Sequence, residues 1–214
     1  MGIKYTVLIL FTATVFLLGW GNKTNEIPQY GMCEISFESY SNSLFQFPRV
    51  NFYLPDGSTV KVDGFYDGGN TYKARAYCKQ AGLWKWEITK NPGFKKRTGK
   101  FTVVSSNFKG KLKKHPDDPY QFAYDNDNWF LHLGGTGYRY LTETEKLWQE
   151  YIDQAVKIGI TKIRTWFCSS RHNVEALFDE ELNMLNLPYW QEMDRRIAYA
   201  LEQHPGYFTI DPLW

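Results

Sequence analysis

Apolar and polar residues alternate along the first half of the chain. Between residues 30 and 105 this pattern recurs over short stretches such as Val50–Leu54 and Thr71–Tyr77. A period of two is typical of β-strands that bury one face. Turn sequences such as Asp56-Gly57 and Asp67-Gly68-Gly69-Asn70 separate the stretches, as they do in β-hairpins. About seven such strands predict an immunoglobulin-like β-sandwich over residues 30–105.

After residue 128 the period changes. Short apolar runs of strand length alternate with stretches of helical spacing, in the order 129–133, 142–158, 160–167, 186–204 and 207 onward. A strand–helix–strand–helix–strand order implies a parallel sheet with right-handed crossovers. A TIM (β/α)₈ barrel needs about 250 residues. We therefore expect residues 129–214 to form an incomplete α/β segment, the truncated start of a TIM barrel.

Two other segments have a distinct composition. Residues 106–128 are rich in Lys, Pro, Asp and Asn, which is typical of a linker between domains. At the N-terminus, Lys4 precedes an apolar run from Tyr5 to Leu18. This run is shorter than the roughly 20 residues of a membrane span and fits a signal peptide over residues 1–21. An uncleaved anchor, which would be the protein's one membrane contact, is the alternative. We expect a secreted, periplasmic or cell-surface protein.

Composition narrows the classes of partner. The chain has 15 Tyr, 15 Phe and 8 Trp, and such rings suit either a β-rich core or a sugar-binding surface. The formal net charge is +2. The basic runs Lys95–Arg97 and Lys109–His115 come without a nucleic-acid motif, so nucleic acid is not an expected partner. The sequence also lacks a metal-ligand cluster and a phosphate-binding loop, and we expect neither a metal nor a cofactor.

Two residue pairs in the predicted sandwich have alternative interpretations. Trp84 and Trp86 alternate with Lys85, so both face the same side, either in the core or as an exposed sugar platform. Cys33 and Cys78 are either buried free thiols or, after export, a disulfide. Cys168 has no obvious partner in the sequence.

A likeness to one enzyme family covers about residues 30–210. It is carried by six stretches: Phe52–Gly57, Val62–Gly69, Ala81–Trp86, Gly99–Val103, Trp129–Gly134 and Lys162–Phe167. In this order they resemble the apiosidase-like glycoside hydrolases, specifically secreted members with an N-terminal β-sandwich domain of unknown function. The resemblance implies a TIM-barrel enzyme acting on complex polysaccharide. Family members often have Asp at the position of Gly135, so the sugar contact that the family pattern implies there is not expected.

The resemblance also bears on catalysis. Glycoside hydrolysis requires two carboxylates, one that protonates the leaving oxygen and one that attacks or activates water. In such barrels both commonly follow later strands than the third. We therefore assign no catalytic residue here and expect this chain to be inactive by itself. Asp211, just past the predicted third strand, is interpreted as a binding residue or an incidental acid.

Five residues are candidates for substrate binding. Arg164 and Trp166 share one face of the predicted second strand, near the C-terminal end, where barrel active sites lie. The resemblance implies that Arg164 supports a nucleophile carboxylate, and a structural ion pair is the alternative. Thr136 and Tyr138 follow the first strand, and Tyr138 is a candidate for stacking on a sugar ring. Arg171 lies in the loop after the second strand, as a cleft residue or a solvated one.

Two classes of function follow from this sequence. The first is the N-terminal fragment of a secreted glycoside hydrolase, with a polysaccharide or oligosaccharide as its partner. The second is a non-enzymatic, carbohydrate- or protein-binding β-sandwich with a vestigial α/β tail. The sequence predicts no oligomeric state.

Overall fold

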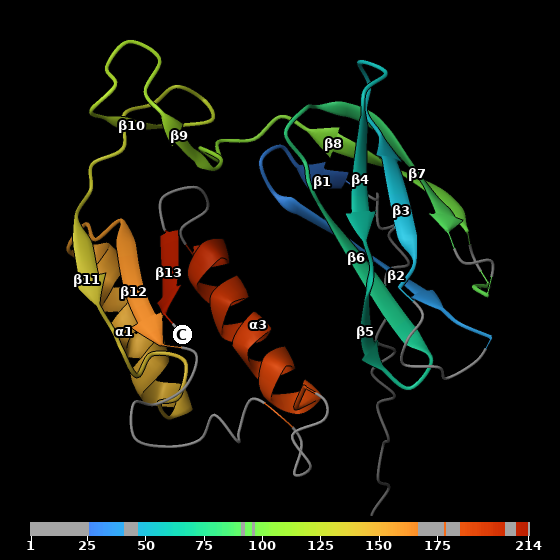
Figure 1. Ribbon diagram of the computed structural model, residues 1–214. Helices are drawn as coiled ribbons and strands as arrows, with labels where there is room; N and C mark the ends of the chain where they lie inside the picture. The colour runs from blue at the N-terminus through green and yellow to red at the C-terminus, as the bar shows by residue number, and fades with distance from the viewer. Residues whose placement is uncertain are drawn as a thin grey trace, which may run out of the picture.

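The computed structural model describes residues 26–40, 47–90, 93–95, 97–166, 178, 185–203 and 209–213. A β-rich first part and an α/β second part are joined by a small hairpin (Figure 1). The predicted signal peptide over residues 1–21, together with Cys168 and Arg171, lies outside the described residues. No helix of the described part of the chain is long and apolar enough to cross a membrane.

The first part consists of two open sheets. One has the strand order β1 (Glu26–Pro28), β8 (Thr98–Val104), β7 (Gly82–Lys90), β3 (Arg49–Tyr53) and β4 (Thr59–Asp63). The other has the order β2 (Met32–Glu38), β6 (Thr71–Tyr77) and β5 (Phe65–Gly68). All neighbouring strands are antiparallel except β1 and β8. This arrangement agrees with the β-sandwich predicted from the alternation.

An aromatic core fills the sandwich. Trp84 is fully buried, stacks on Phe101 with ring centroids 5.7 Å apart, and donates its indole hydrogen to the carbonyl of Gln80 at 2.8 Å. Trp86 is buried on the same side of β7. The core interpretation of this pair is therefore confirmed. Neither indole offers a platform for sugar.

The two cysteines of the sandwich are buried free thiols. Cys33 on β2 lies opposite Ala76, two residues before Cys78. A hydrogen bond with the Cys78 thiol, assisted by burial, raises the pKa of Cys33. The free-thiol alternative thus describes this structure.

The predicted linker contains secondary structure of its own. Strands β9 (Leu112–Lys114) and β10 (Phe122–Tyr124) form an antiparallel hairpin. The hydroxyl of Tyr77, from the sandwich, donates to the carboxylate of Asp125, and the backbone N–H of Lys111 donates to the same carboxylate at 3.0 Å. The hairpin is therefore tied to the sandwich by side chains that lie 48 residues apart in the sequence.

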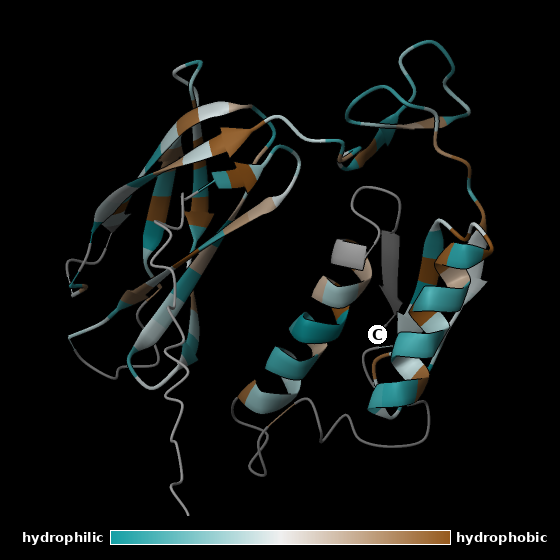
Figure 2. Ribbon diagram, turned by 180° about the vertical axis from the view of Figure 1, so that it is seen from behind, coloured by the Kyte–Doolittle hydropathy of each residue, from teal (hydrophilic) through white to brown (hydrophobic). Residues whose placement is uncertain are grey.

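The second part is a parallel three-stranded sheet with two helices. Its strand order is β11 (Gly134–Thr136), β12 (Lys162–Trp166) and β13 (Thr209–Leu213). Helices α1 (Glu145–Lys157) and α3 (Leu187–Gln203) cover one face of this sheet (Figure 1). The helices turn hydrophilic surfaces outward and hydrophobic ones toward the sheet (Figure 2). Their shared core includes Trp148, Ile152, Ile163, Met193 and Ala200.

The first strand of this sheet begins later than predicted. Residues 129–133 were expected to be the strand, whereas pairing with β12 starts at Gly134. The reason is that Trp129 bridges to Ala123 of the hairpin, so this segment continues the hairpin. His132 is consequently exposed. Leu131 and Leu133 are exposed beside it.

Candidate functional site

Four of the five predicted binding residues gather at the C-terminal ends of β11 and β12. Thr136 is the last residue of β11 and does not follow the strand as predicted, and it lies opposite Arg164 in the parallel register. Beyond the strand, the Gly137 N–H donates to the Arg164 carbonyl at 2.8 Å, and the Trp166 N–H donates to the Tyr138 carbonyl at 3.2 Å. These backbone bonds extend the pairing past Thr136 and bring Tyr138 beside Trp166.

The rings of Tyr138 and Trp166 stack on each other. Their centroids lie 4.4 Å apart at an interplanar angle of 20°. Tyr138 is 44% exposed, and Trp166 is half-buried. A flat and partly exposed aromatic pair of this kind can accept the apolar face of a sugar, and each ring pre-positions the other. The sequence predicted Tyr138 and Trp166 as separate candidates for substrate binding, but their contact is visible only in the structure.

Arg164 projects from the face of the sheet that the helices leave uncovered. Its neighbours Ile163 and Thr165 are fully buried, whereas Arg164 is exposed. The backbone of Arg164 pairs with that of Asp211, which lies within β13 and not past its end as predicted. Among the residues of these three strands, Asp211 is the only acid. The strands therefore supply one carboxylate where glycoside hydrolysis needs two.

A buried arginine of α3 holds the loop that carries Tyr138. Arg196 is 9% exposed and donates to the carbonyls of Tyr140 at 3.2 Å and Glu143 at 2.8 Å. The hydroxyl of Tyr140 donates back to the Arg196 carbonyl. Glu192 balances the buried charge, since it accepts from Arg196 Nε at 2.7 Å. Sequence reasoning missed Arg196, although its place between the apolar Met193 and Ala200 on one helix face was a usable signal.

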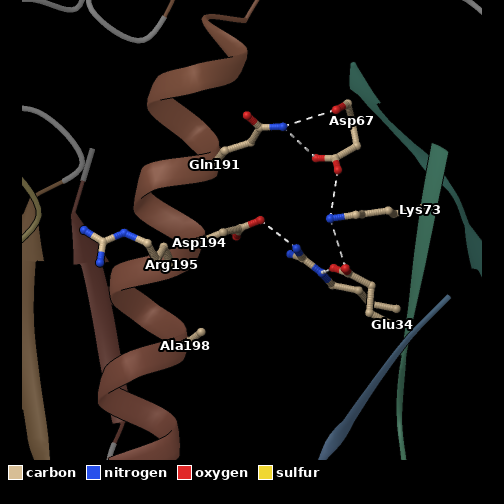
Figure 3. A pocket seen from close by; sticks show the side chains of 8 residues that line it. Glu34, Asp67, Lys73, Gln191, Asp194, Arg195 and Ala198 are labelled. Atoms are coloured by element: carbon tan, nitrogen blue, oxygen red, sulfur yellow. Dashed lines mark hydrogen bonds and ion pairs between the residues drawn. The ribbon is translucent and has the colours of Figure 1, made fainter. Parts of the chain in front are cut away.

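A polar pocket of about 330 Å³ lies between the sandwich and α3 (Figure 3). Arg75 of β6 donates to Asp194 of α3 at 2.6 Å and to Glu34 at 2.7 Å. Strands β2, β5 and β6 line one side of the pocket and helix α3 lines the other. The lining residues are Glu34, Asp67, Lys73 and Arg75 from the strands, and Gln191, Asp194, Arg195 and Ala198 from α3.

The charges in this pocket are already paired. Lys73 bonds Asp67 at 2.8 Å and Glu34 at 3.0 Å, and the amide of Gln191 donates to Asp67 at 3.1 Å (Figure 3). The Asp194 carboxylate, followed by Glu34, raises the pKa of Arg75. A charged ligand would have to displace these ion pairs. We therefore interpret the pocket as the interface between the two parts of the chain.

Among the described residues, no group of three or more His, Cys, Asp or Glu side chains could hold a metal ion. The region around Arg164 and the aromatic pair can thus offer stacking and hydrogen bonds to a ligand. Arg171, the fifth predicted binding residue, lies outside the described residues.

Comparison with known proteins gives a domain match over part of the chain and a shared fold. Residues 26–91 match a family described as a domain of unknown function, DUF5060. No curated protein matches this chain. The crystal structure of a protein from Bacteroides vulgatus, provisionally described as a glycoside hydrolase, is similar with a TM-score of 0.73 and 20% identity. The match covers 88% of this chain and 41% of that protein, so this chain spans less than half of the neighbour's length. At this identity the two share a fold.

Two other solved structures are more distant. The Lin-41 filamin domain matches 40% of this chain and 88% of its own, with 15% identity and a TM-score of 0.31. β-Glucuronidase 3 from Bacteroides uniformis matches 84% of this chain and 25% of its own, with 14% identity and a TM-score of 0.26. Likenesses at this level carry no argument about function.

Proposed function

We propose that this chain is the N-terminal portion of a secreted glycoside hydrolase of the apiosidase-like type that acts on complex polysaccharide. On this proposal the sandwich precedes a TIM barrel, and β11 to β13 are the first three strands of that barrel. The fold shared with the Bacteroides vulgatus protein over 88% of this chain supports this arrangement. So does the parallel sheet with helices on one face.

The observation that carries the proposal is the stacked pair of Tyr138 and Trp166 beside Arg164. All three lie at the C-terminal ends of parallel strands, which is where barrel enzymes bind their substrates. Arg164 also lies on the sheet face opposite the helices, the face that would line a barrel's interior. An aromatic surface next to a guanidinium group suits a sugar, because the ring face stacks and the hydroxyls accept hydrogen bonds.

The same proposal accounts for the expected lack of activity. One carboxylate on β13 cannot both protonate a leaving group and attack an anomeric carbon. The acid/base and the nucleophile would come from later strands of the barrel. These 214 residues would then bind sugar weakly and hydrolyse nothing.

Binding and hydrolysis can be tested on the full chain. Oligosaccharides released from plant cell-wall polysaccharides are titrated by NMR, and reducing ends are assayed in parallel. Trp166→Ala and Tyr138→Ala should each weaken binding about tenfold, because truncating an aromatic contact typically costs about 1.4 kcal/mol or more. Tyr120→Ala is the control, since this ring on the hairpin is 91% exposed. Release of reducing sugar by the purified chain would contradict the proposal, as would equal binding by all three variants.

The alternative, a non-enzymatic sandwich that binds sugar on a tryptophan platform, loses its platform because Trp84 and Trp86 are buried. The outer face of β2, β6 and β5 is also occupied, since α3 docks on it through Arg75 and Asp67. These contacts favour the hydrolase fragment.

A further inference from the structure

Both outer faces of the sandwich carry ion pairs across neighbouring strands, Arg49 with Asp63 on the five-stranded sheet among them, but the five-stranded sheet also places two like charges opposite each other. On the three-stranded sheet, Glu34 of β2 lies directly opposite Arg75 of β6, and the two form an ion pair. On the five-stranded sheet, Lys85 of β7 lies directly opposite Lys100 of β8. Opposite charges facing each other across strands stabilise a sheet, whereas like charges destabilise it. The first face docks on α3 through Arg75, whereas the fold does not explain the facing lysines of the second.

The lysines form a basic face on the outside of the five-stranded sheet. Tyr53, Lys85 and Lys100 follow one another in a single cross-strand row over β3, β7 and β8. Lys61 of β4 lies opposite Asn51, in the next row. All three lysines are exposed. Within the described part of the chain, none of the three has an ion-pair partner. We call Tyr53, Lys61, Lys85 and Lys100 the lysine face.

A second feature of this face is an amide without a partner. The Oδ1 atom of Asn51 is buried and accepts no hydrogen bond among the described residues. Buried polar atoms are nearly always satisfied, so an unpaired one needs an explanation. Beside it, the half-buried Tyr53 ring is held by a hydrogen bond from its hydroxyl to Glu87 at 3.3 Å. A held aromatic ring, an amide, the Glu87 carboxylate and three exposed lysines therefore share this outer face.

We infer that the lysine face binds an acidic, carboxylate-bearing polysaccharide. The lysines attract carboxylates by charge, and the adjacent strands space Lys85 and Lys100 by about 4.8 Å, so that neighbouring acidic groups on one polymer can meet both. The half-buried Tyr53 ring offers a surface for a sugar. This inference rests on the proposed function. It adds the substrate class and a second binding surface on a different sheet from Tyr138 and Trp166.

The test compares an acidic polymer with a neutral one. Binding of the full chain to polygalacturonate and to uncharged galactan is measured by affinity electrophoresis, at about 50 and about 300 mM NaCl. The variant Lys85→Gln/Lys100→Gln should bind polygalacturonate about tenfold more weakly, since two surface charge contacts are lost. The higher salt concentration should weaken wild-type binding, because it shortens the range of exposed charges.

A matched control separates the lysine face from net charge. Lys146→Gln/Lys157→Gln removes the same two charges from exposed positions of α1 and should change affinity less than twofold. Removing the Lys85–Lys100 repulsion should leave the thermal midpoint unchanged or higher, so weaker binding cannot be ascribed to unfolding. Equal losses in the two double variants would overturn the inference, as would no preference for polygalacturonate over galactan or equally tight binding of duplex DNA.

A further variant keeps this test independent of the proposed function. The Trp166→Ala variant should no longer bind neutral oligosaccharides but should still bind polygalacturonate, because the Trp166 ring lies on β12 and not on the sandwich. If Trp166→Ala also lost polygalacturonate, the lysine face would not be the site. If neutral oligosaccharides failed to bind while Lys85→Gln/Lys100→Gln lost polygalacturonate, the proposed function would fail and this inference would stand.

Discussion

Glu192 should make the α/β part of the chain sensitive to acid. Hydrogen bonds from Arg195, at 2.7 Å, and from Arg196 lower the pKa of the Glu192 carboxyl from its ordinary value of 4.5 to about 2. A carboxyl with a lowered pKa stabilises the folded state above the unfolded-state pKa. That contribution is lost as pH falls toward the folded-state pKa. The window for Glu192 therefore runs from pH 4.5 down to about 2.

The contribution of Glu192 to the free energy of unfolding follows from the difference between its folded and unfolded pKa values, reduced for screening by water. A change from 4.5 to about 2 corresponds to about 3 kcal/mol for a carboxylate fully shielded from water. Because 37% of the Glu192 side chain is exposed, water screens much of that energy. Arg196, which pairs with Glu192, is only 9% exposed, and its burial preserves part of the interaction energy. We expect Glu192→Gln to lower the free energy of unfolding by about 1 kcal/mol at about pH 7.

Urea unfolding followed by the helical circular dichroism signal measures this effect, since α1 and α3 are the helices of the described residues. The difference between wild type and Glu192→Gln should shrink progressively below pH 4.5. Glu150→Gln is the control, because Glu150 is 57% exposed and its partner Lys146 lies 3.8 Å away. Glu145, which also binds Arg195, is present in all three proteins. A Glu192→Gln difference that stays constant from about pH 7 to about pH 3 would refute the reasoning.

Two further predictions concern the sandwich and its interface. Trp84→Ala should destabilise the sandwich by about 3–5 kcal/mol, because it empties a fully buried site beside Phe101. Urea unfolding measures this loss of stability, and a loss below about 1 kcal/mol would contradict the placement of Trp84 in the core. A double-mutant cycle of Arg75→Ala and Asp194→Ala should give a coupling energy of about 0.5–1 kcal/mol, limited by exposures of 36% and 48% and reduced by salt. Zero coupling at low salt would mean that the sandwich does not dock on α3 through this pair.

How far the candidate site could be predicted differs from residue to residue. The alternation along residues 162–166 put Arg164 and Trp166 on one face, and the structure buries Ile163 and Thr165 on the other. Position after a strand correctly brought Tyr138 to the same end of the sheet as Trp166. The start of β11 was predicted too early, because the apolar run at residues 129–133 gives no sign that the hairpin pairs with Trp129.

The sequence by itself determined the β-sandwich and which side chains of a strand share a face, so that Trp84 and Trp86 were known to lie on one side of their strand. A strand repeats every two residues and a helix every 3.6, so local spacing reveals which side chains face inward. Only the tertiary structure decided which charges meet. Arg75 and Asp194 lie 119 residues apart, and Tyr140 and Arg196 lie 56 apart. The stack of Tyr138 on Trp166 and the pairing of Lys85 with Lys100 depend equally on strand register. Register and packing are set by the whole set of buried contacts, and no local period encodes them.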